Sequence, residues 1–352
     1  MKSRMKTLQK SSARQQGLSL VELMIALLLA SILTVGLYQV FSSNSFSFRL
    51  NEASARAQES GRIASEVLGR EIRGAGYFGC NVESVVNNLD DTDESYDPDS
   101  HSFDISAAVS SAAATRPADA IAGTHHLRLS GMENSGIEVR TMGPATSASF
   151  DITERGGLVD GSVIAISDCS GTDIFQVSSI QQGGGGNLKI TVVANSGEDD
   201  PGNDFTDNGC TNCLANSYGA GAQILQPYNR TYFIGQSNTT GEPALMLQRT
   251  DGTVVEMVEG VVDMRIRMGT SNTPNNPVNQ WTDVTGAISW NDVRAVQVSL
   301  LVRAGRNNLL EGTQNLCFPG WNDCSSGPNF TAPDNRMYRV YDFTMNVRNS
   351  SR

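Results

Sequence analysis

The chain has 352 residues, of which 39% are hydrophobic, so it can form a real core without requiring a second globular unit. Its formal net charge is −11, and it becomes −16 without the five basic residues of the first seventeen positions. A body this acidic repels phosphate backbones, so we expect no direct nucleic-acid binding.

The N-terminus begins with a basic leader, residues 1–17, that contains five cations and no acid. An apolar run over residues 18–40 follows, and as a helix of about 1.5 Å per residue it is long enough to cross a hydrocarbon layer of roughly 30 Å. By the positive-inside rule the leader stays in the cytoplasm and the residues from about 41 onward are exported. The sequence therefore predicts a single-pass protein of a bacterial inner membrane with a periplasmic C-terminus.

The end of the leader carries a second signal. An ordinary secretory signal is cut after its apolar region, whereas residues 17–22, Gly-Leu-Ser-Leu-Val-Glu, resemble the type III signal of prepilins, which a membrane peptidase cuts after the glycine. The resemblance implies cleavage between Gly17 and Leu18, removal of the leader and methylation of the new N-terminus at Leu18. The alternative is a plain signal anchor that is not processed here.

Glu22 is the unusual residue of the apolar run, because a carboxylate in lipid costs about 2.5–3.5 kcal/mol near the centre and less near the ends. In the pilin family the acid at this place is thought to pair with the free N-terminal amine of a neighbouring subunit. The resemblance therefore implies that Glu22 is a subunit-packing carboxylate that meets the amine of Leu18 in the next protomer. In a plain signal anchor, Glu22 would instead lie near the lipid headgroups.

Beyond the span the sequence keeps a helical period. Apolar residues recur at three- and four-residue steps, the spacing of one helix face. They are Phe46, Leu50, Ala53, Ala57, Ala64 and Leu68. We expect an amphipathic periplasmic helix over residues 41–73 that ends at the glycines Gly74 and Gly76. Gly61 and Gly69 interrupt it, at roughly 1 kcal/mol each relative to Ala, and we expect them to mark close packing.

Residues 74–352 change to short alternating runs that are typical of half-buried strands, separated by many of the 34 glycines. The predicted strands include residues 126–129, 137–140 and 162–166, and hairpins are predicted at 174–193 and 244–258. Segments 84–120 and 270–280 are predicted as surface loops. The predicted fold is α+β, with a long N-terminal hydrophobic and amphipathic helix packed against a predominantly antiparallel β head.

Further stretches resemble the PilW family of minor pilins. The helix end at residues 70–80 leads into a Gly-Tyr-x-Gly-Cys turn, and residues 293–303 and 339–349 are similar to strands near the end of that family's domain. Residues 81–290 share only the family's general character, so no single residue is assigned a role there.

Six cysteines follow the apolar run, and on the exported side of the membrane we expect them to form disulfides. They are Cys80, Cys169, Cys210, Cys213, Cys317 and Cys324. Six cysteines allow 15 pairings, of which Cys317 with Cys324 is favoured as a local bridge, while Cys210 and Cys213 either pair or take separate partners. Structural zinc on Cys210-x-x-Cys213 is disfavoured, because the second pair is spaced too widely.

The sequence contains no phosphate-binding loop and no Gly-x-Ser-x-Gly elbow, so we predict no enzyme and no cofactor. The adjacent His125 and His126 would point to opposite faces of a strand, which makes them poor joint metal ligands. The acidic segments 90–99 and 198–204 leave calcium binding open. The first lacks the EF-hand pattern, since Tyr96 and Ser102 replace its glycine and its bidentate glutamate.

Together these features predict a minor pilin that takes part in initiating and assembling a type IV pilus, with its helix packed among other pilins and its head at or near the fibre tip. The resemblance implies other minor pilins, the major pilin, the prepilin peptidase and a large tip adhesin as partners. It also implies the inner membrane and then the fibre at the cell surface as locations, with twitching motility and cell adhesion as consequences. The alternatives are a type II secretion pseudopilin and a membrane-tethered, ligand-binding tip adhesin.

Overall fold

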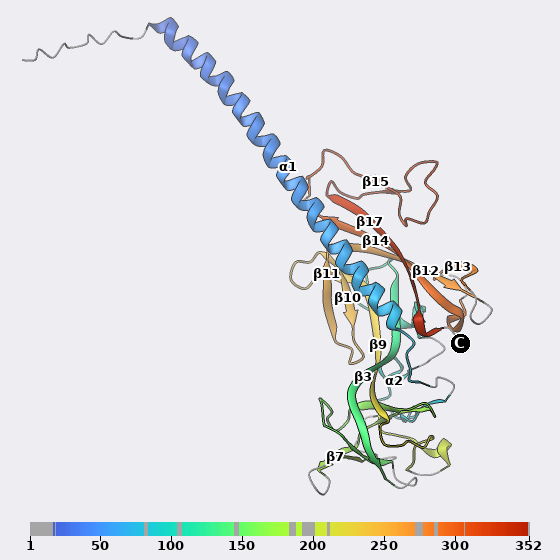
Figure 1. Cartoon of the computed structure of the whole chain (residues 1–352). Helices are drawn as coiled ribbons and strands as arrows, with labels where there is room; N and C mark the ends of the chain where they lie inside the picture. The colour runs from blue at the N-terminus through green and yellow to red at the C-terminus, as the bar shows by residue number, and fades with distance from the viewer. Residues whose placement is uncertain are drawn as a thin grey trace, which may run out of the picture. The chain divides into compact units, whose positions relative to one another are not determined.

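The structure is a computed structural model. It describes residues 17, 19–80, 84–103, 108–143, 148–182, 188–191, 201–209, 212–271, 277–284, 288–305 and 307–350. The chain divides into two compact units, residues 1–52 and 53–352, and each is described by itself. One long N-terminal helix and a mostly antiparallel β domain confirm the predicted α+β class (Figure 1).

The described part of the first unit is almost entirely helix α1 (Leu20–Gly74), taken up to Glu52. Two hydroxyls inside its apolar run are satisfied by the helix itself, because Ser31 donates to the Leu28 carbonyl and Thr34 donates to the Ala30 carbonyl. Such back-bonding removes the cost of an unpaired hydroxyl in an apolar environment. The segment can therefore remain helical in lipid.

In the second unit the remainder of α1 packs one face into the core. The buried residues are Ala53, Ala57, Gly61, Ala64, Leu68, Gly69 and Ile72, which recur at three- and four-residue steps. The predicted stripe is therefore found from Ala53 onward. Phe46, at the start of the predicted stripe, lies on the same helix and is 42% exposed.

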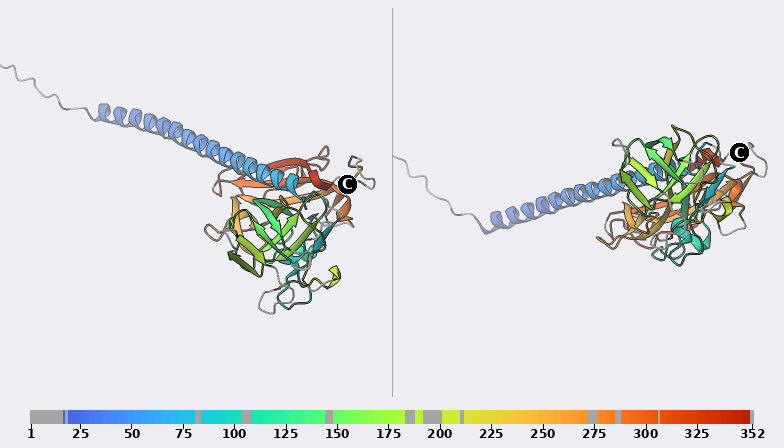
Figure 2. Two further views of the ribbon diagram at one scale, coloured as in Figure 1. Left: turned by 60° about the horizontal axis from the view of Figure 1, so that its bottom comes forward. Right: turned by 90° about the horizontal axis from the view of Figure 1, so that it is seen from below.

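The two glycines inside this part of α1 mark close approaches, as predicted. A Cβ built on Gly61 would lie 2.2 Å from Cε2 of Tyr341, and one on Gly69 would lie 2.8 Å from Cε of Met345. Both contacts come from β17 (Met337–Asn346), the last strand of the chain. The helix therefore lies directly on the C-terminal strand, as Figures 1 and 2 show in blue and red.

The larger sheet is antiparallel except for the pair β1 and β6, and its main path runs in the order β1-β6-β5-β9-β3-β4-β8-β7. Its strands are β1 (Val85–Asn87), β2 (Val109–Ser110), β3 (His126–Met142), β4 (Ser149–Ile152), β5 (Val163–Ser167), β6 (Thr172–Gln176), β7 (Ser179–Gln182), β8 (Leu188–Thr191), β9 (Gln223–Gln236), β10 (Pro243–Gln248) and β11 (Val254–Glu259). β10 pairs with β9 and β11, and β2 pairs with β3. The long pair β3 and β9 links the core beneath α1 to a second core around Phe150 and Phe175.

A second sheet has the order β13-β12-β14-β17, with β12 (Val261–Thr270), β13 (Gln280–Asp283) and β14 (Val293–Ala304). A small hairpin joins β15 (Asn315–Leu316) and β16 (Phe330–Thr331). The described short helices are α2 (Pro98–His101), η2 (Ala113–Thr115), η4 (Thr206–Asn208), η5 (Trp290–Asp292) and η6 (Arg348–Ser350).

Two sequence predictions about loops need correction or restriction. Segment 84–120 is not simply a surface loop, because it contains β1, α2, β2 and η2 and buries Asn88 through hydrogen bonds to β6. For the predicted loop at 270–280, residues 272–276 lie outside the described residues, as does the glycine-rich tip of the β7–β8 hairpin. The hairpin pairings themselves are present in β7 with β8 and in β10 with β11.

Candidate functional site

The predicted processing site lies at the start of α1. Gly17 is exposed and precedes the helix, while Leu18 lies outside the described residues. The Ser19 hydroxyl accepts a hydrogen bond from the Glu22 backbone N–H at 3.3 Å, which is the arrangement of a helix N-cap. The Glu22 carboxylate thus lies in the first turn, where the partial positive charge of the helix N-terminus stabilises an acid.

The surface around Glu22 is apolar and unburied. All residues from Leu20 to Phe41 are exposed, and Glu22 is the only charged residue between Leu20 and Phe48. α1 is long and apolar enough to cross a membrane. An exposed apolar surface of this extent marks a membrane or protein interface, because water disfavours it.

The described cysteines are oxidised, so the expected disulfide bonding is confirmed. Cys80 is bonded to Cys169, which joins the turn after α1 to the β5–β6 turn across a sequence separation of 89 residues. Cys317 is bonded to Cys324, which is the predicted local bridge. Cys213 is also disulfide-bonded, and Cys210 lies outside the described residues.

The turn that links α1 to the sheet requires a glycine, because of its backbone conformation and the lack of space for a side chain. Gly79 has a φ of +99°, and a Cβ there would lie 2.2 Å from the Ser167 hydroxyl and 2.4 Å from the Thr172 hydroxyl. Thr172 in turn donates a hydrogen bond to the Phe78 carbonyl at 3.0 Å. The Gly-Tyr-x-Gly-Cys segment therefore fits against β5 and β6 only with glycine at position 79.

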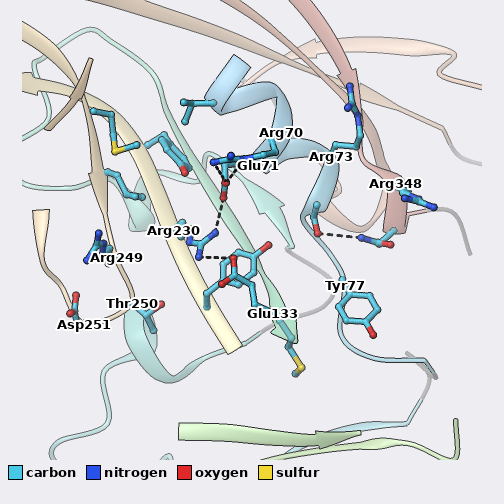
Figure 3. Close-up of a pocket in the computed structure, with 18 residues that line it drawn as sticks. Arg70, Glu71, Arg73, Tyr77, Glu133, Arg230, Arg249, Thr250, Asp251 and Arg348 are labelled. Atoms are coloured by element: carbon cyan, nitrogen blue, oxygen red, sulfur yellow. Dashed lines mark hydrogen bonds and ion pairs between the residues drawn. The ribbon is translucent and has the colours of Figure 1, made fainter. Parts of the chain in front are cut away.

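An open pocket of about 1250 Å³ lies between the last turns of α1 and strands β3, β9, β10 and β11 (Figure 3). At its centre the Arg230 guanidinium contacts Glu71 at 2.7 Å and Glu133 at 2.7 Å. Burial opposes the charge of Arg230, but its contacts with the two glutamates outweigh burial and raise its pKa. Arg230 also lies 4.3 Å from the Tyr228 ring centre, and burial raises the pKa of Tyr228 to about 12.

Sequence reasoning missed this pocket. Its arginines include Arg70 and Arg73 from α1, Arg249 from the β10–β11 turn and Arg348 from η6. Because these positions are far apart in the sequence, no local motif indicates the pocket.

The histidines lie in separate surroundings. His125 accepts a hydrogen bond from the Ile266 N–H at 2.9 Å through Nδ1, whereas Nε2 of His126 lies 3.0 Å from the Ala112 carbonyl. Burial lowers the pKa of both imidazoles, that of His126 to about 4. Within the described ranges, no group of three or more His, Cys, Asp or Glu side chains could hold a metal ion.

The first acidic segment uses carboxylates for local turns. Asp90 accepts bonds from the backbone N–H and hydroxyl of Thr92, at 2.9 and 2.6 Å. Asp93 accepts the same pair from Ser95, at 2.8 and 2.6 Å, and these bonds lower the pKa of Asp93. This pattern is that of Asx turns, which stabilise a loop without an ion. In the second segment, residues 198–200 lie outside the described residues.

Two family models match parts of the chain. Residues 231–349 match the family described as Type IV Pilus-assembly protein W, and residues 12–38 match the Prokaryotic N-terminal methylation motif. The first range includes strands β12, β14 and β17, and the second includes Gly17, Leu18 and Glu22. No curated protein and no solved structure matches the chain.

Proposed function

Because these two matches identify the chain as a PilW-family minor pilin, we propose that it takes part in initiating and assembling a type IV pilus, with its head at or near the fibre tip. Domains of this family are structural, so we propose no enzymatic activity. The proposal includes cleavage between Gly17 and Leu18, methylation of Leu18 and a periplasmic head over residues 74–352. The finer division of the helix into a membrane span, 18–40, and a periplasmic part, 41–73, also stays a proposal.

The observation that carries the proposal is one carboxylate on an otherwise uncharged and exposed apolar helix surface. An ionised Glu22 in lipid needs a positive partner, because an unpaired charge there costs several kcal/mol. Removal of the leader would create such a partner, the α-amine of Leu18, in a neighbouring subunit. Lateral packing with other pilins would therefore bury the apolar helix surface and also supply a positive partner for the Glu22 carboxylate.

The proposed partners are other minor pilins, the major pilin, the prepilin peptidase and a large tip adhesin. The fit of the N-terminal motif and the apolar helix to a membrane-anchored pilin supports an inner-membrane precursor. We further propose that the mature chain moves into the fibre at the cell surface, where it contributes to twitching motility and cell adhesion.

A gene replacement with Glu22→Ala tests this role against deletion of the gene. We expect deletion to remove most surface fibres, and the variant to reach the membrane and lose its leader but to be absent from sheared fibres. Glu22→Asp keeps the charge and serves as the matched control, for which we expect partial incorporation. Immunoblots of the sheared fraction and fibre counts by electron microscopy provide the measurements.

Two results would contradict the proposal. Normal fibres that lack a single adhesion phenotype after deletion would indicate the alternative, a membrane-tethered adhesin. Full incorporation of the Glu22→Ala chain would refute the electrostatic mechanism. Mass spectrometry of the incorporated wild-type chain should find an N-terminus at Leu18 with a methylated amine, whereas an intact Met1 would refute processing.

A further inference from the structure

We propose that the arginine-lined pocket at the end of α1 binds an acidic peptide segment of a partner protein (Figure 3). The pocket lies wholly within residues 53–352 and is separate from the N-terminal helix surface that would pack in a fibre. The inference therefore goes beyond the proposed role in pilus assembly.

The pocket has a positive charge that contrasts with the rest of the chain. Five arginines and three acids line it, in a protein whose formal net charge is −11. Two of the acids, Glu71 and Glu133, both contact the central Arg230. Clustering of like charges in a concave site raises the local concentration of oppositely charged ligands, so this site favours anions.

Three of the arginines are not held in short ion pairs with the protein's own acids. Arg73 and Arg249 make no ion pair within the described part of the chain. The Arg73 guanidinium donates a hydrogen bond to the Met345 sulfur, and Arg249 lies close enough to Asp251 to interact with it electrostatically. Arg70 is 77% exposed and contacts Glu71 at 3.4 Å, while Arg230 holds the same glutamate at 2.7 Å. The Arg70 end of this pair is open to solvent and its contact is the longer of the two, so the pair is weak and a ligand carboxylate can compete with it for Arg70.

The three arginines reach the pocket from two sides. Arg70 and Arg73 extend from the last turns of α1, Arg249 lies across the pocket on the β10–β11 turn, and Arg230 lies between them (Figure 3). A planar guanidinium can bind a carboxylate through two parallel hydrogen bonds. Carboxylates spaced along one extended segment could therefore contact both sides at once.

The size and the other lining residues favour a peptide over a small anion or a nucleic acid. A volume of about 1250 Å³ exceeds the roughly 300–1000 Å³ of ordinary small-molecule sites. Tyr77, Tyr228, Leu247 and Met257 supply aromatic and apolar surface, which together with arginine is typical of protein interfaces. Asp251 and Glu133 would repel a continuous phosphate backbone but tolerate a peptide of mixed sequence.

The experiment measures binding of short fluorescent peptides to the full chain in detergent micelles by fluorescence anisotropy. One peptide alternates glutamate with leucine and serine, and the other has glutamine in place of every glutamate. We expect the glutamate peptide alone to bind, and we expect binding to weaken as salt is raised. The assay needs no fibre, so failure of the peptide to bind would not argue against the role in pilus assembly. In the same way, a negative result in the fibre experiments would not argue against this binding site.

Arg70→Ala and Arg62→Ala form a matched pair of variants. Both arginines lie on α1, both contact a glutamate, and their side chains are 77% and 70% exposed, but only Arg70 lines the pocket. We expect Arg70→Ala to weaken peptide binding about fivefold and the double variant R73A/R249A to weaken it more than tenfold, whereas Arg62→Ala changes it less than twofold. Circular dichroism would verify that each variant remains folded.

Four results would overturn the proposal. The first is that the glutamine peptide binds as tightly as the glutamate peptide, and the second is that Arg62→Ala weakens binding as much as Arg70→Ala. The third is full displacement of the glutamate peptide by millimolar phosphate. The fourth is that a single-stranded oligodeoxynucleotide binds more tightly than the glutamate peptide. The third would indicate a general anion site, and the fourth would indicate a nucleic-acid site.

Discussion

Asp173 in β6 is a fully buried carboxylate that joins three segments of the head. One oxygen accepts hydrogen bonds from the Asn88 side chain at 3.0 Å and the Ala215 N–H at 2.9 Å. The other accepts bonds from the Asn216 N–H and side chain at 3.0 Å each and from the Tyr218 hydroxyl at 2.5 Å. A buried charge is tolerated only with such complete satisfaction.

We therefore expect Asp173→Asn to destabilise the protein by about 3 kcal/mol. The amide nitrogen would replace one of the accepting oxygens, and the buried donors bonded to that oxygen would be left without an acceptor. Urea unfolding of the full chain in detergent, followed by tryptophan fluorescence, would measure the change. The exposed Asp207 is the control, and Asp207→Asn should alter stability by less than about 0.5 kcal/mol. Equal stability of the two variants would show that the network does not stabilise the fold.

The sequence singles out Gly17 and Glu22, because each is unusual for its immediate neighbours, and their roles stay predictions. It could not reveal Asp173, since its donors come from residues 88 and 215–218 and an acid in a short strand resembles any solvent-facing residue. The pocket arginines were missed for the same reason. Contacts between distant segments leave no local pattern.

At the level of single elements, the contact between α1 and β17 depends on glycine. An added methyl group at Gly61 would lie 2.2 Å from the Tyr341 ring, whereas at Gly69 it would meet the flexible end of Met345 at 2.8 Å. Alanine is the better helix former by about 1 kcal/mol at both positions. The two sites differ in how far the neighbouring side chain must move and in how readily it can do so.

We expect Gly61→Ala to lower stability by about 1–2 kcal/mol, because displacement of the Tyr341 ring outweighs the gain in helix propensity. Gly69→Ala should be neutral or slightly stabilising, since the Met345 methyl can rotate away. Thermal unfolding of both variants, monitored by circular dichroism, compares them directly. A stabilised Gly61→Ala variant would show that the helix does not pack closely against β17.

The alternation of apolar and polar residues predicted strands in the right places but divided one long strand into two. Residues 126–129 and 137–140 were predicted as separate strands, but both belong to β3. The pairing of β3 with β9 shifts register between Asn134 and Ile137, next to Gly136 with a φ of +78°. Such a bulge lets one strand continue where the alternation of apolar and polar residues is interrupted. The interruption between the two predicted strands therefore did not indicate a loop.

For the whole molecule, the histidines set a pH dependence of stability. Burial lowers the pKa of His101, His125 and His126, the last to about 4 from an ordinary value near 6.5. The unfolded chain therefore binds more protons than the folded chain between about pH 6.5 and 4. The stabilisation by neutral histidines is complete above pH 6.5 and is lost as the pH falls toward 4.

We expect the unfolding free energy to be about 2 kcal/mol lower at pH 5 than at pH 7.5, with His126 as the largest single contributor. Urea unfolding of the full chain at intermediate pH values gives the profile. His126→Gln should flatten it substantially, because glutamine does not titrate. An unchanged slope in this variant would exclude His126 as the cause.

The packing of α1 against β17 also has a consequence for the order in which the chain is made. The Arg339 guanidinium donates to the Ser54 hydroxyl at 2.8 Å, and the Asn349 side chain donates to the Gly74 and Ala75 carbonyls at 3.2 and 3.1 Å. The alanine face of the helix is translated early, but the residues of β17 that cover it are translated much later. A chain whose translation stops before β17 therefore exposes that face to proteases and chaperones until the strand is made.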